Sequence, residues 1–374
     1  MLKSSKMIVI SNQIAKTADT GVVAGLKLNP LFIGDIAVKG GLIFAPMAGI
    51  TDMPMRILAR EGGAGLVCTE MISAKALVNS DKRTITMLKI AKDEQPVSVQ
   101  LFGAEPETVS EAAKIAESRG ADIIDLNIGC PARKIAKSGA GVKLAEDEKK
   151  MAAIMQRTVK AVRIPVTAKI RIGLEPGINM APRMIEIAAS CGVKAITVHA
   201  RPASSFHSGQ PDISALKEAV ETSRIPVIGN GGITDEDSAY EFVLKTGCAG
   251  LMIGRAAIGD CMLFSRIRYF FETGEKLRKP SWEDRISLLK KHALMSASFY
   301  GEERGMILMR KTAPYYLKGL PNASAIRNSF NVITSLSELN VLLAKIWNSP
   351  YFEAPVNGSF QEAEIHRKLY RGQE

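Results

Sequence analysis

Short apolar runs alternate with longer amphipathic segments along most of the chain. Apolar runs bounded by turn residues are typical of buried strands, and an apolar stripe at helical spacing is typical of a helix packed on a sheet. Eight runs predict strands, at 42–45, 66–69, 97–101, 123–126, 166–170, 195–198, 227–228 and 251–253. Segments between them predict helices, among them 106–118, 147–162, 180–190, 212–222 and 234–246.

Eight strand–helix units over roughly 230 residues predict an α/β fold, a TIM (β/α)8 barrel, rather than an open doubly wound sheet. A hairpin-like segment leads from residue 28 into the first strand. Thr51-Asp52 stands just ahead of Pro54, a pattern that predicts a capped helix reaching about residue 60.

The alternation stops beyond about residue 270. Four helices are expected there, at 282–300, 306–317, 323–334 and 338–347, with Gly301 and Gly305 among the breaks between them. We therefore predict a flexible N-terminal extension over 1–27, a barrel over 28–270, a small C-terminal α-helical domain over 271–350 and a tail over 351–374.

Polar residues stand at or just past the C-terminal end of nearly every expected strand. In a barrel of parallel strands these ends meet at one mouth, where such barrels carry their active sites. One polar residue at a strand end is more often solvated than functional, but a succession of them favours a site. In chain order, the residues at or just past the eight strand ends are Pro46-Met47, Glu70, Gln100, Asn127 with Cys130, Lys169 with Arg171, His199 with Arg201, Asn230-Gly231-Gly232, and Gly254-Arg255.

Glycines after the last two strands indicate a phosphate site. Gly231-Gly232 and Gly254-Arg255 offer backbone N–H groups, and the second pair opens the next helix with a guanidinium beside it. Loops after strands seven and eight are the usual phosphate site of this fold. Since neither a dinucleotide fingerprint nor a P-loop occurs in the right context, the phosphorylated group is expected to lie in the barrel.

The composition indicates a globular protein with a basic surface. Hydrophobic residues make up 46% and charged residues 23%, and the net charge of +11 fits either a polyanionic partner or a merely basic enzyme. The 5 cysteines and 4 histidines show no paired spacing, so neither disulfides nor a bound metal is expected. No membrane span or signal peptide is evident, and cytoplasmic residence is the default expectation.

Seven motifs together carry a family resemblance. They are Ala45-Pro-Met-Ala-Gly-Ile-Thr-Asp52, Val99-Gln-Leu-Phe-Gly103, Asp125-Leu-Asn-Ile-Gly-Cys-Pro131, Lys169-Ile-Arg171, Val198-His-Ala-Arg201, Ile228-Gly-Asn-Gly-Gly-Ile233 and Met252-Ile-Gly-Arg-Ala256. In this order and spacing, over about residues 28–345, the chain resembles the tRNA-dihydrouridine synthases. The later Arg310-Lys and Tyr316-Leu-Lys-Gly319 are most similar to the bacterial B-type subfamily.

The resemblance implies an oxidoreductase in which a TIM barrel holds FMN and a helical domain binds tRNA. Such enzymes use NADPH to reduce specific uridines of the tRNA D-loop to 5,6-dihydrouridine. Neither a protein partner nor association into oligomers is implied. By motif, the flavin contacts are Pro46, Met47, Ala48, Gln100, Lys169, His199, Asn230, Gly231, Gly232, Gly254 and Arg255. Asn127, Arg171 and Arg201 would face the flipped uracil.

The chemistry of the reaction agrees with these residues. Reduction of the pyrimidine double bond takes a hydride at C6 and a proton at C5, and a reduced flavin supplies the hydride. The thiol of Cys130 then supplies the proton. The uridine must first leave its stack, and a basic, aromatic helical domain suits RNA. Its residues are Arg304, Arg310, Lys311, Lys318 and Arg327, with Tyr315 and Tyr316. The alternative is an ordinary solvated helical face over a core lined by the tyrosines.

Four positions depart from the family pattern, namely Lys143, Pro202, His207 and Gly232. Two other functions stay open. A dihydroorotate dehydrogenase-like barrel would use FMN on a free pyrimidine, and the basic helical domain argues against it. A tRNA-binding barrel without chemistry is the other, and the retention of Cys130 with the flavin contacts argues against that one.

Overall fold

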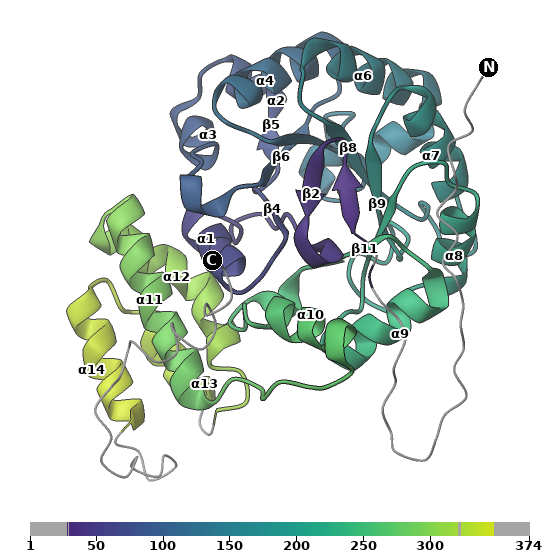
Figure 1. The fold of residues 1–374 in the computed structure, drawn as a ribbon. Coiled ribbons are helices and arrows are strands. Elements are labelled where there is room, and N and C mark those ends of the chain that lie inside the picture. The colour runs from purple at the N-terminus through teal and green to yellow at the C-terminus, as the bar shows by residue number, and fades with distance from the viewer. Residues whose placement is uncertain (1–27, 29, 321–322, 348–374) are drawn as a thin grey trace, which may run out of the picture.

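The computed structural model describes residues 28, 30–320 and 323–347. The expected extension over 1–27 and the tail over 351–374 lie outside these residues. Within them, eight parallel strands close into a barrel in the order β4-β3-β11-β10-β9-β8-β7-β6, because β4 also pairs with β6 (Figure 1). The predicted TIM barrel is confirmed.

The barrel strands lie where the apolar runs predicted them. They are β3 (Leu42–Phe44), β4 (Leu66–Cys68), β6 (Val97–Phe102), β7 (Ile123–Asn127), β8 (Val166–Arg171), β9 (Ala195–His199), β10 (Val227–Asn230) and β11 (Gly250–Ile253). The surrounding helices are α1 (Met53–Glu61), α4 (Pro106–Ser118), α6 (Glu148–Ala161), α7 (Ala181–Ser190), α8 (Ile213–Glu221), α9 (Glu236–Thr246) and α10 (Leu263–Thr273). As predicted, Asp52 caps α1, accepting from Met55 N at 3.1 Å.

Several short elements were not predicted. A strand, β5 (Ile72–Ser73), and two helices, α2 (Ala74–Val78) and α3 (Lys82–Met87), lie between β4 and β6. A further helix, α5 (Arg133–Lys137), follows β7. Each is shorter than two helical turns, so periodicity alone carries too little signal to detect it.

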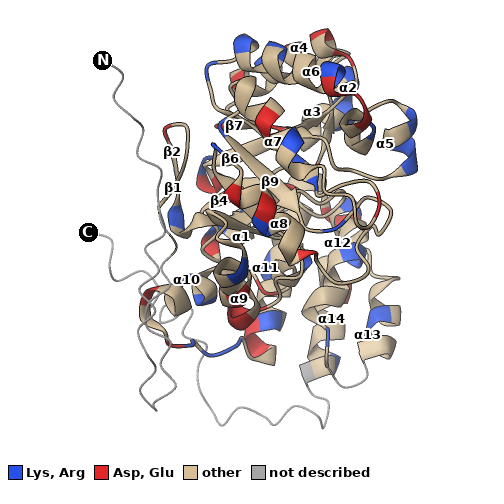
Figure 2. Ribbon diagram, turned by 90° about the vertical axis from the view of Figure 1, so that its right-hand side faces the viewer, with Lys and Arg blue, Asp and Glu red and all other residues tan. Residues whose placement is uncertain are grey.

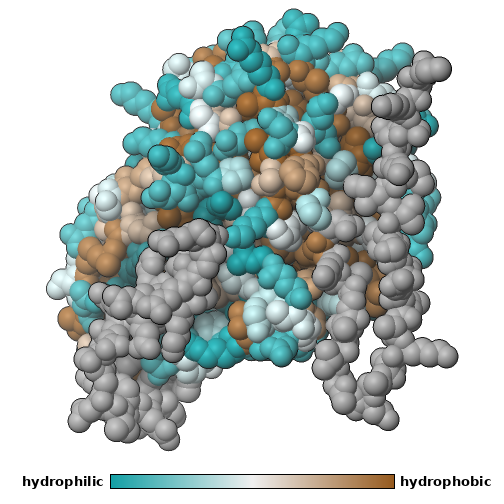
Figure 3. Space-filling view, viewed as in Figure 1, coloured by the Kyte–Doolittle hydropathy of each residue, from teal (hydrophilic) through white to brown (hydrophobic). Residues whose placement is uncertain are grey.

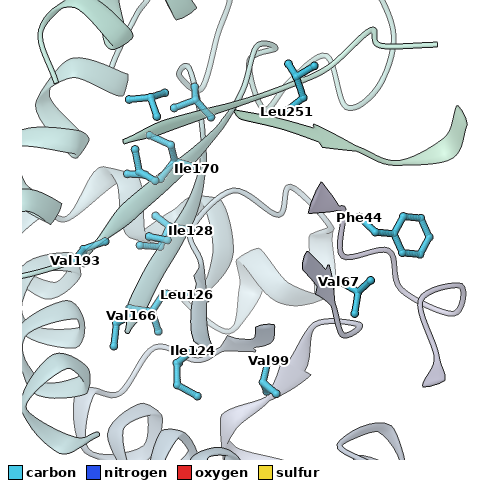
Figure 4. Packing of buried hydrophobic residues seen from close by; sticks show 14 of the residues in the cluster. Phe44, Val67, Val99, Ile124, Leu126, Ile128, Val166, Ile170, Val193 and Leu251 are labelled. Atoms are coloured by element: carbon cyan, nitrogen blue, oxygen red, sulfur yellow. The ribbon is translucent and has the colours of Figure 1, made fainter. Parts of the chain in front are cut away.

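The period-2 alternation of the strands divides the core in two. Outward-facing residues such as Val67, Val99 and Ile124 pack under the helices (Figure 4). At the amino ends of the strands, inward-facing apolar residues pack against the hairpin formed by β1 (Leu31–Ile33) and β2 (Ile36–Val38). The hairpin closes this end of the barrel, leaving polar inward positions to the other end.

Four helices follow the barrel and share a core of their own. They are α11 (Trp282–Tyr300), α12 (Glu302–Tyr316), α13 (Ala323–Phe330) and α14 (Leu336–Trp347), and α11 packs beside α1 (Figure 1). The predicted break at Gly305 is wrong, because this residue lies inside α12. A Cβ there would lie 2.6 Å from the carbonyl carbon of Ser296, so glycine permits the close crossing of α11 and α12.

The hairpin end of the molecule presents a mixed surface, with hydrophilic and hydrophobic residues interspersed (Figure 3). Of the helices in the described part of the chain, none combines the length and apolar character that crossing a membrane requires.

Candidate active site

Inward-facing side chains at the carboxyl ends of the strands form a polar site. The parallel register pairs Asn127 with Lys169, and it pairs His199 with both Arg171 and Asn230. These residues therefore meet at the end of the barrel opposite the hairpin. Figure 2 shows the two ends, with β1–β2 at one and the basic helix α5 at the other.

A chain of hydrogen bonds crosses from β8 to the loop after β7. Thr167 Oγ1 and Gln100 Nε2 each donate to the buried carboxylate of Asp125 at 2.7 Å. Gln100 Oε1 accepts from Asn127 Nδ2 at 2.8 Å. Burial raises the pKa of Asp125, whereas these two hydrogen bonds oppose the rise. Asp125 was not predicted as a site residue, although it alternates with Asn127 on the inward face of one strand.

The Cys130 loop is held by backbone contacts. Asn127 Oδ1 accepts from Cys130 N at 3.0 Å and from Gly129 N at 3.3 Å. On the other side, Val142 N donates to Cys130 O at 3.1 Å. Arg171 Nε donates to Gly129 O at 3.0 Å. The loop therefore presents a partly exposed thiol in a fixed position at the mouth.

Lys169 lies among cationic neighbours. Its Nζ donates to Asn230 Oδ1 at 3.0 Å, and Asn230 Nδ2 donates to Met252 O at 2.7 Å. Burial and, secondly, the charge of Arg171 lower the pKa of Lys169 to about 8. An anion at this position would relieve both effects, so the site favours a negatively charged ligand or ring edge.

The glycine loops form a cradle beside these groups. Gly231 has φ +124°, and a Cβ there would lie 3.0 Å from the ring of His199. At Gly254 a Cβ would lie 3.4 Å from Met47 Sδ, which brings the loops after the first and eighth barrel strands together. Arg255 is exposed and begins the short helix η4 (Arg255–Ala257). Backbone N–H groups of glycine loops beside a guanidinium fit a phosphate.

The other predicted residues lie around the same mouth. Pro46 and the exposed Ala48 belong to the turn after β3, and Gly232 is exposed beside Pro211. Arg201 is buried and donates through Nε to Gly209 O at 3.1 Å. The structure thus brings together every residue predicted for the site. Gln100 and Arg201 also form hydrogen bonds within the protein, which leaves fewer of their polar atoms for a ligand.

Comparison with known proteins places this site in a family. The model of a family described as Dihydrouridine synthase (Dus) matches residues 43–349. The chain belongs to the dihydrouridine synthase family. It is 38% identical over 318 residues to a probable tRNA-dihydrouridine synthase of Rickettsia conorii, covering 85% of this chain and 96% of that one. It is 39% identical over 303 residues to tRNA-dihydrouridine synthase B of Pseudomonas aeruginosa, covering 80% and 90%.

These relatives confirm the resemblance to dihydrouridine synthases, including the B-type, and the prediction of an oxidoreductase. Among solved structures, the chain is similar to 6-hydroxypseudooxynicotine amine oxidase from Pseudomonas geniculata N1, with a TM-score of 0.53. The identity is 16%, over 66% of this chain and 50% of that one. This likeness shows the fold alone.

One departure from the dihydrouridine synthase pattern has a clear position. The ring of His207 lies 5.7 Å from that of His199, at the mouth. Burial and the charge of Arg171 lower the pKa of His207 to about 4, so it is neutral at neutral pH. Its contact with His199 joins the last residue of β9 to the loop that follows, and it was not foreseen from the sequence. Pro202, the second departure, accepts from Arg171 Nη1 through its carbonyl at 3.0 Å.

In this dihydrouridine synthase, the basic residues predicted for RNA separate into two groups. Four are exposed, Arg304, Lys311, Lys318 and Arg327. Arg310 is half-buried and donates to Ile333 O at 3.1 Å. Tyr316 is fully buried, 2.9 Å from His292 Nδ1, so its predicted place in an RNA-binding surface is wrong. It packs in the core because its hydroxyl finds a buried partner there.

Proposed function

We propose that this chain reduces specific uridines of the tRNA D-loop to 5,6-dihydrouridine, with bound FMN as the immediate reductant and NADPH as the source of electrons. One observation supports the proposal above the others. A fixed, partly exposed thiol and a cationic, glycine-lined cradle open onto the same mouth of a barrel whose sequence belongs to this family.

The residues of the cradle would hold the flavin. Pro46, Met47 and Ala48 would line its ring, while Gln100, Lys169, His199 and Asn230 would contact its polar edge and side chain. Gly231, Gly232, Gly254 and Arg255 would bind the phosphate. When bound, FMN supplies the hydride that uracil C6 receives. Lys169 would stabilise negative charge at the ring, because among the described residues its Nζ donates to Asn230 and forms no ion pair.

The protein itself supplies the proton and the substrate contacts. Cys130 donates the proton to uracil C5, from a backbone held on both sides. Asn127, Arg171 and Arg201 would orient the extruded uracil. Arg171 also donates a hydrogen bond to Gly129 O, next to Cys130, so the same residue would contact the uracil and hold the loop that carries the acid.

The division of labour between the two parts of the chain is also a proposal. Residues 28–270 would form the catalytic barrel and 271–350 the tRNA-binding helical domain. A stacked uridine is out of reach of a thiol inside a barrel mouth, so the helical domain would hold the tRNA while the base is extruded.

The direct test uses purified protein loaded with FMN and supplied with NADPH. We expect dihydrouridine, detected by mass spectrometry of digested RNA, from an unmodified tRNA transcript and not from free uridine or orotate. Turnover of orotate or dihydroorotate alone would favour the dihydroorotate dehydrogenase-like alternative. Binding of tRNA without any dihydrouridine would favour the barrel that has lost its chemistry.

The basic side chains of α5 give a testable prediction about tRNA binding. Arg133, Lys134 and Lys137 are exposed, and in the described part of the chain none of the three forms an ion pair. Pro131 and Ala132 separate them from Cys130 in sequence, and Figure 2 shows the basic residues of α5. Reversing all three charges is expected to weaken tRNA binding and to reduce the slope of log K against log salt by about 2, since each lost phosphate contact removes roughly 0.7–0.9.

The matched control reverses Lys160, Lys194 and Arg224, which are exposed where chain segments enter the amino ends of the strands. This triple change alters the net charge equally at the opposite end of the barrel. Filter binding over a salt series measures both variants. An equal loss of affinity in the two would mean that net charge acts, and that α5 makes no local contact with tRNA.

A further inference from the structure

The turn that joins β3 to α1 is held from two sides. Glu70, just past β4, accepts a hydrogen bond from Gly49 N. Gly49 has φ +73°, and a Cβ on it would lie 2.6 Å from Lys311 Nζ of α12. The positive φ favours glycine here, and the closeness of Lys311 Nζ shows that the helical domain reaches the turn directly.

The turn is stiff enough to pass this constraint on to Met47. Met47 N donates to Thr51 Oγ1 at 3.0 Å, and the N–H groups of Ile50 and Thr51 both donate to Met47 O at 3.1 Å. Thr51 is fully buried. Met47 Sδ in turn lies 3.4 Å from the place of a Cβ on Gly254. A displacement of Gly49 is therefore expected to displace Met47 at the mouth of the barrel.

A second residue of the helical domain contacts the same turn. Tyr300, at the end of α11, lines a small cavity together with Asp52, and burial raises the pKa of Asp52 to about 6. A cavity of about 30 Å³ lies between the two parts of the chain, lined by Gly49, Asp52, Glu70, Tyr300 and Thr312. A space of this size holds little more than a water molecule between the turn and the helical domain.

We propose that Glu70 and Lys311 are positioning residues for the reduction: Glu70 fixes the turn that carries Met47, and Lys311 makes that position depend on α12. The helical domain would then both hold tRNA and set the shape of the flavin site. This inference rests on the proposed function, because Met47 matters to the reaction only if a flavin lies beside it.

Three variants test the inference in the full-length protein: Glu70→Ala, Glu70→Gln and Lys311→Met. Glutamine keeps an oxygen that accepts from Gly49 N, so it serves as the rescue. Glu105→Ala and Lys290→Met, both at exposed side chains away from the turn, serve as controls. The measurements are the Kd of FMN for flavin-free protein, the visible circular dichroism of the bound flavin, and kcat and KM with tRNA.

We expect Glu70→Ala to raise the Kd of FMN about tenfold and to alter the dichroism, since a hydrogen bond to a charged group is lost. Glu70→Gln should recover most of the affinity. Lys311→Met should change the dichroism and lower kcat, whereas the controls behave as the unaltered chain.

Three results would count against the inference. If Glu70→Ala leaves the flavin affinity and the dichroism unchanged, Glu70 is not a positioning residue. If Lys311→Met raises only the KM for tRNA and leaves kcat and the dichroism unchanged, Lys311 is an RNA contact rather than a positioning residue. An unaltered chain that binds no FMN would overturn the proposed function as well, which separates that failure from the other two.

Discussion

Replacing Cys130 with alanine is expected to lower the turnover of tRNA by about 10²–10⁴-fold, the usual contribution of a positioned general acid. Binding of flavin and of tRNA should change little. The reason is local: Asn127 and Val142 form hydrogen bonds with the backbone of Cys130, so the loop keeps its shape when the side chain is shortened. Only the proton donor is removed.

Single-turnover measurements with FMN-loaded, pre-reduced protein and unmodified tRNA separate this step from reduction by NADPH. Cys191→Ala is the matched control, because Cys191 is buried at the end of α7 with its sulfur 3.7 Å from Ala152 O. It should keep full turnover. If Cys130→Ala converts unmodified tRNA at the rate of the unaltered chain, Cys130 is not the acid and another donor must face uracil C5.

The sequence predicted the barrel and its mouth because both follow from local patterns. Each strand is a short apolar run, and closure of eight parallel strands carries their carboxyl ends to one place. Polar residues placed there by alternation, such as Asn127, Lys169 and His199, must then lie close together. Knowledge of the topology alone was enough to assemble this part of the site.

Contacts between distant segments could not be read in the same way. The hydrogen bond from Gly49 N to Glu70 depends on how the loops after the neighbouring strands β3 and β4 fold, and the contact of Lys311 with Gly49 depends on how α12 packs on the barrel. The same limit explains the error at Gly305. Glycine ends many helices, and only the crossing of α11 with α12 shows that this one serves close packing.

A buried ion pair supports the same turn and gives the largest expected effect on stability. Arg56 and Glu94 are both fully buried, and Arg56 Nη2 donates to Glu94 Oε1 at 3.1 Å. Arg56 Nη1 also donates to Thr51 O at 3.0 Å. Replacing Arg56 with methionine leaves the Glu94 carboxylate buried without a counter-charge, so we expect a loss of about 3–5 kcal/mol in the free energy of unfolding.

Urea unfolding followed by circular dichroism measures this loss. Arg183→Met is the control, because the Arg183–Glu148 pair has a similar distance, 2.9 Å, but side chains 58% and 50% exposed. Solvent screens such a pair, and its removal should cost less than about 1 kcal/mol. The double variant Arg56→Met, Glu94→Met should be more stable than Arg56→Met alone, since no charge stays buried. Equal losses from Arg56→Met and Arg183→Met would mean that water reaches Glu94 and that burial of the pair does not govern its energy.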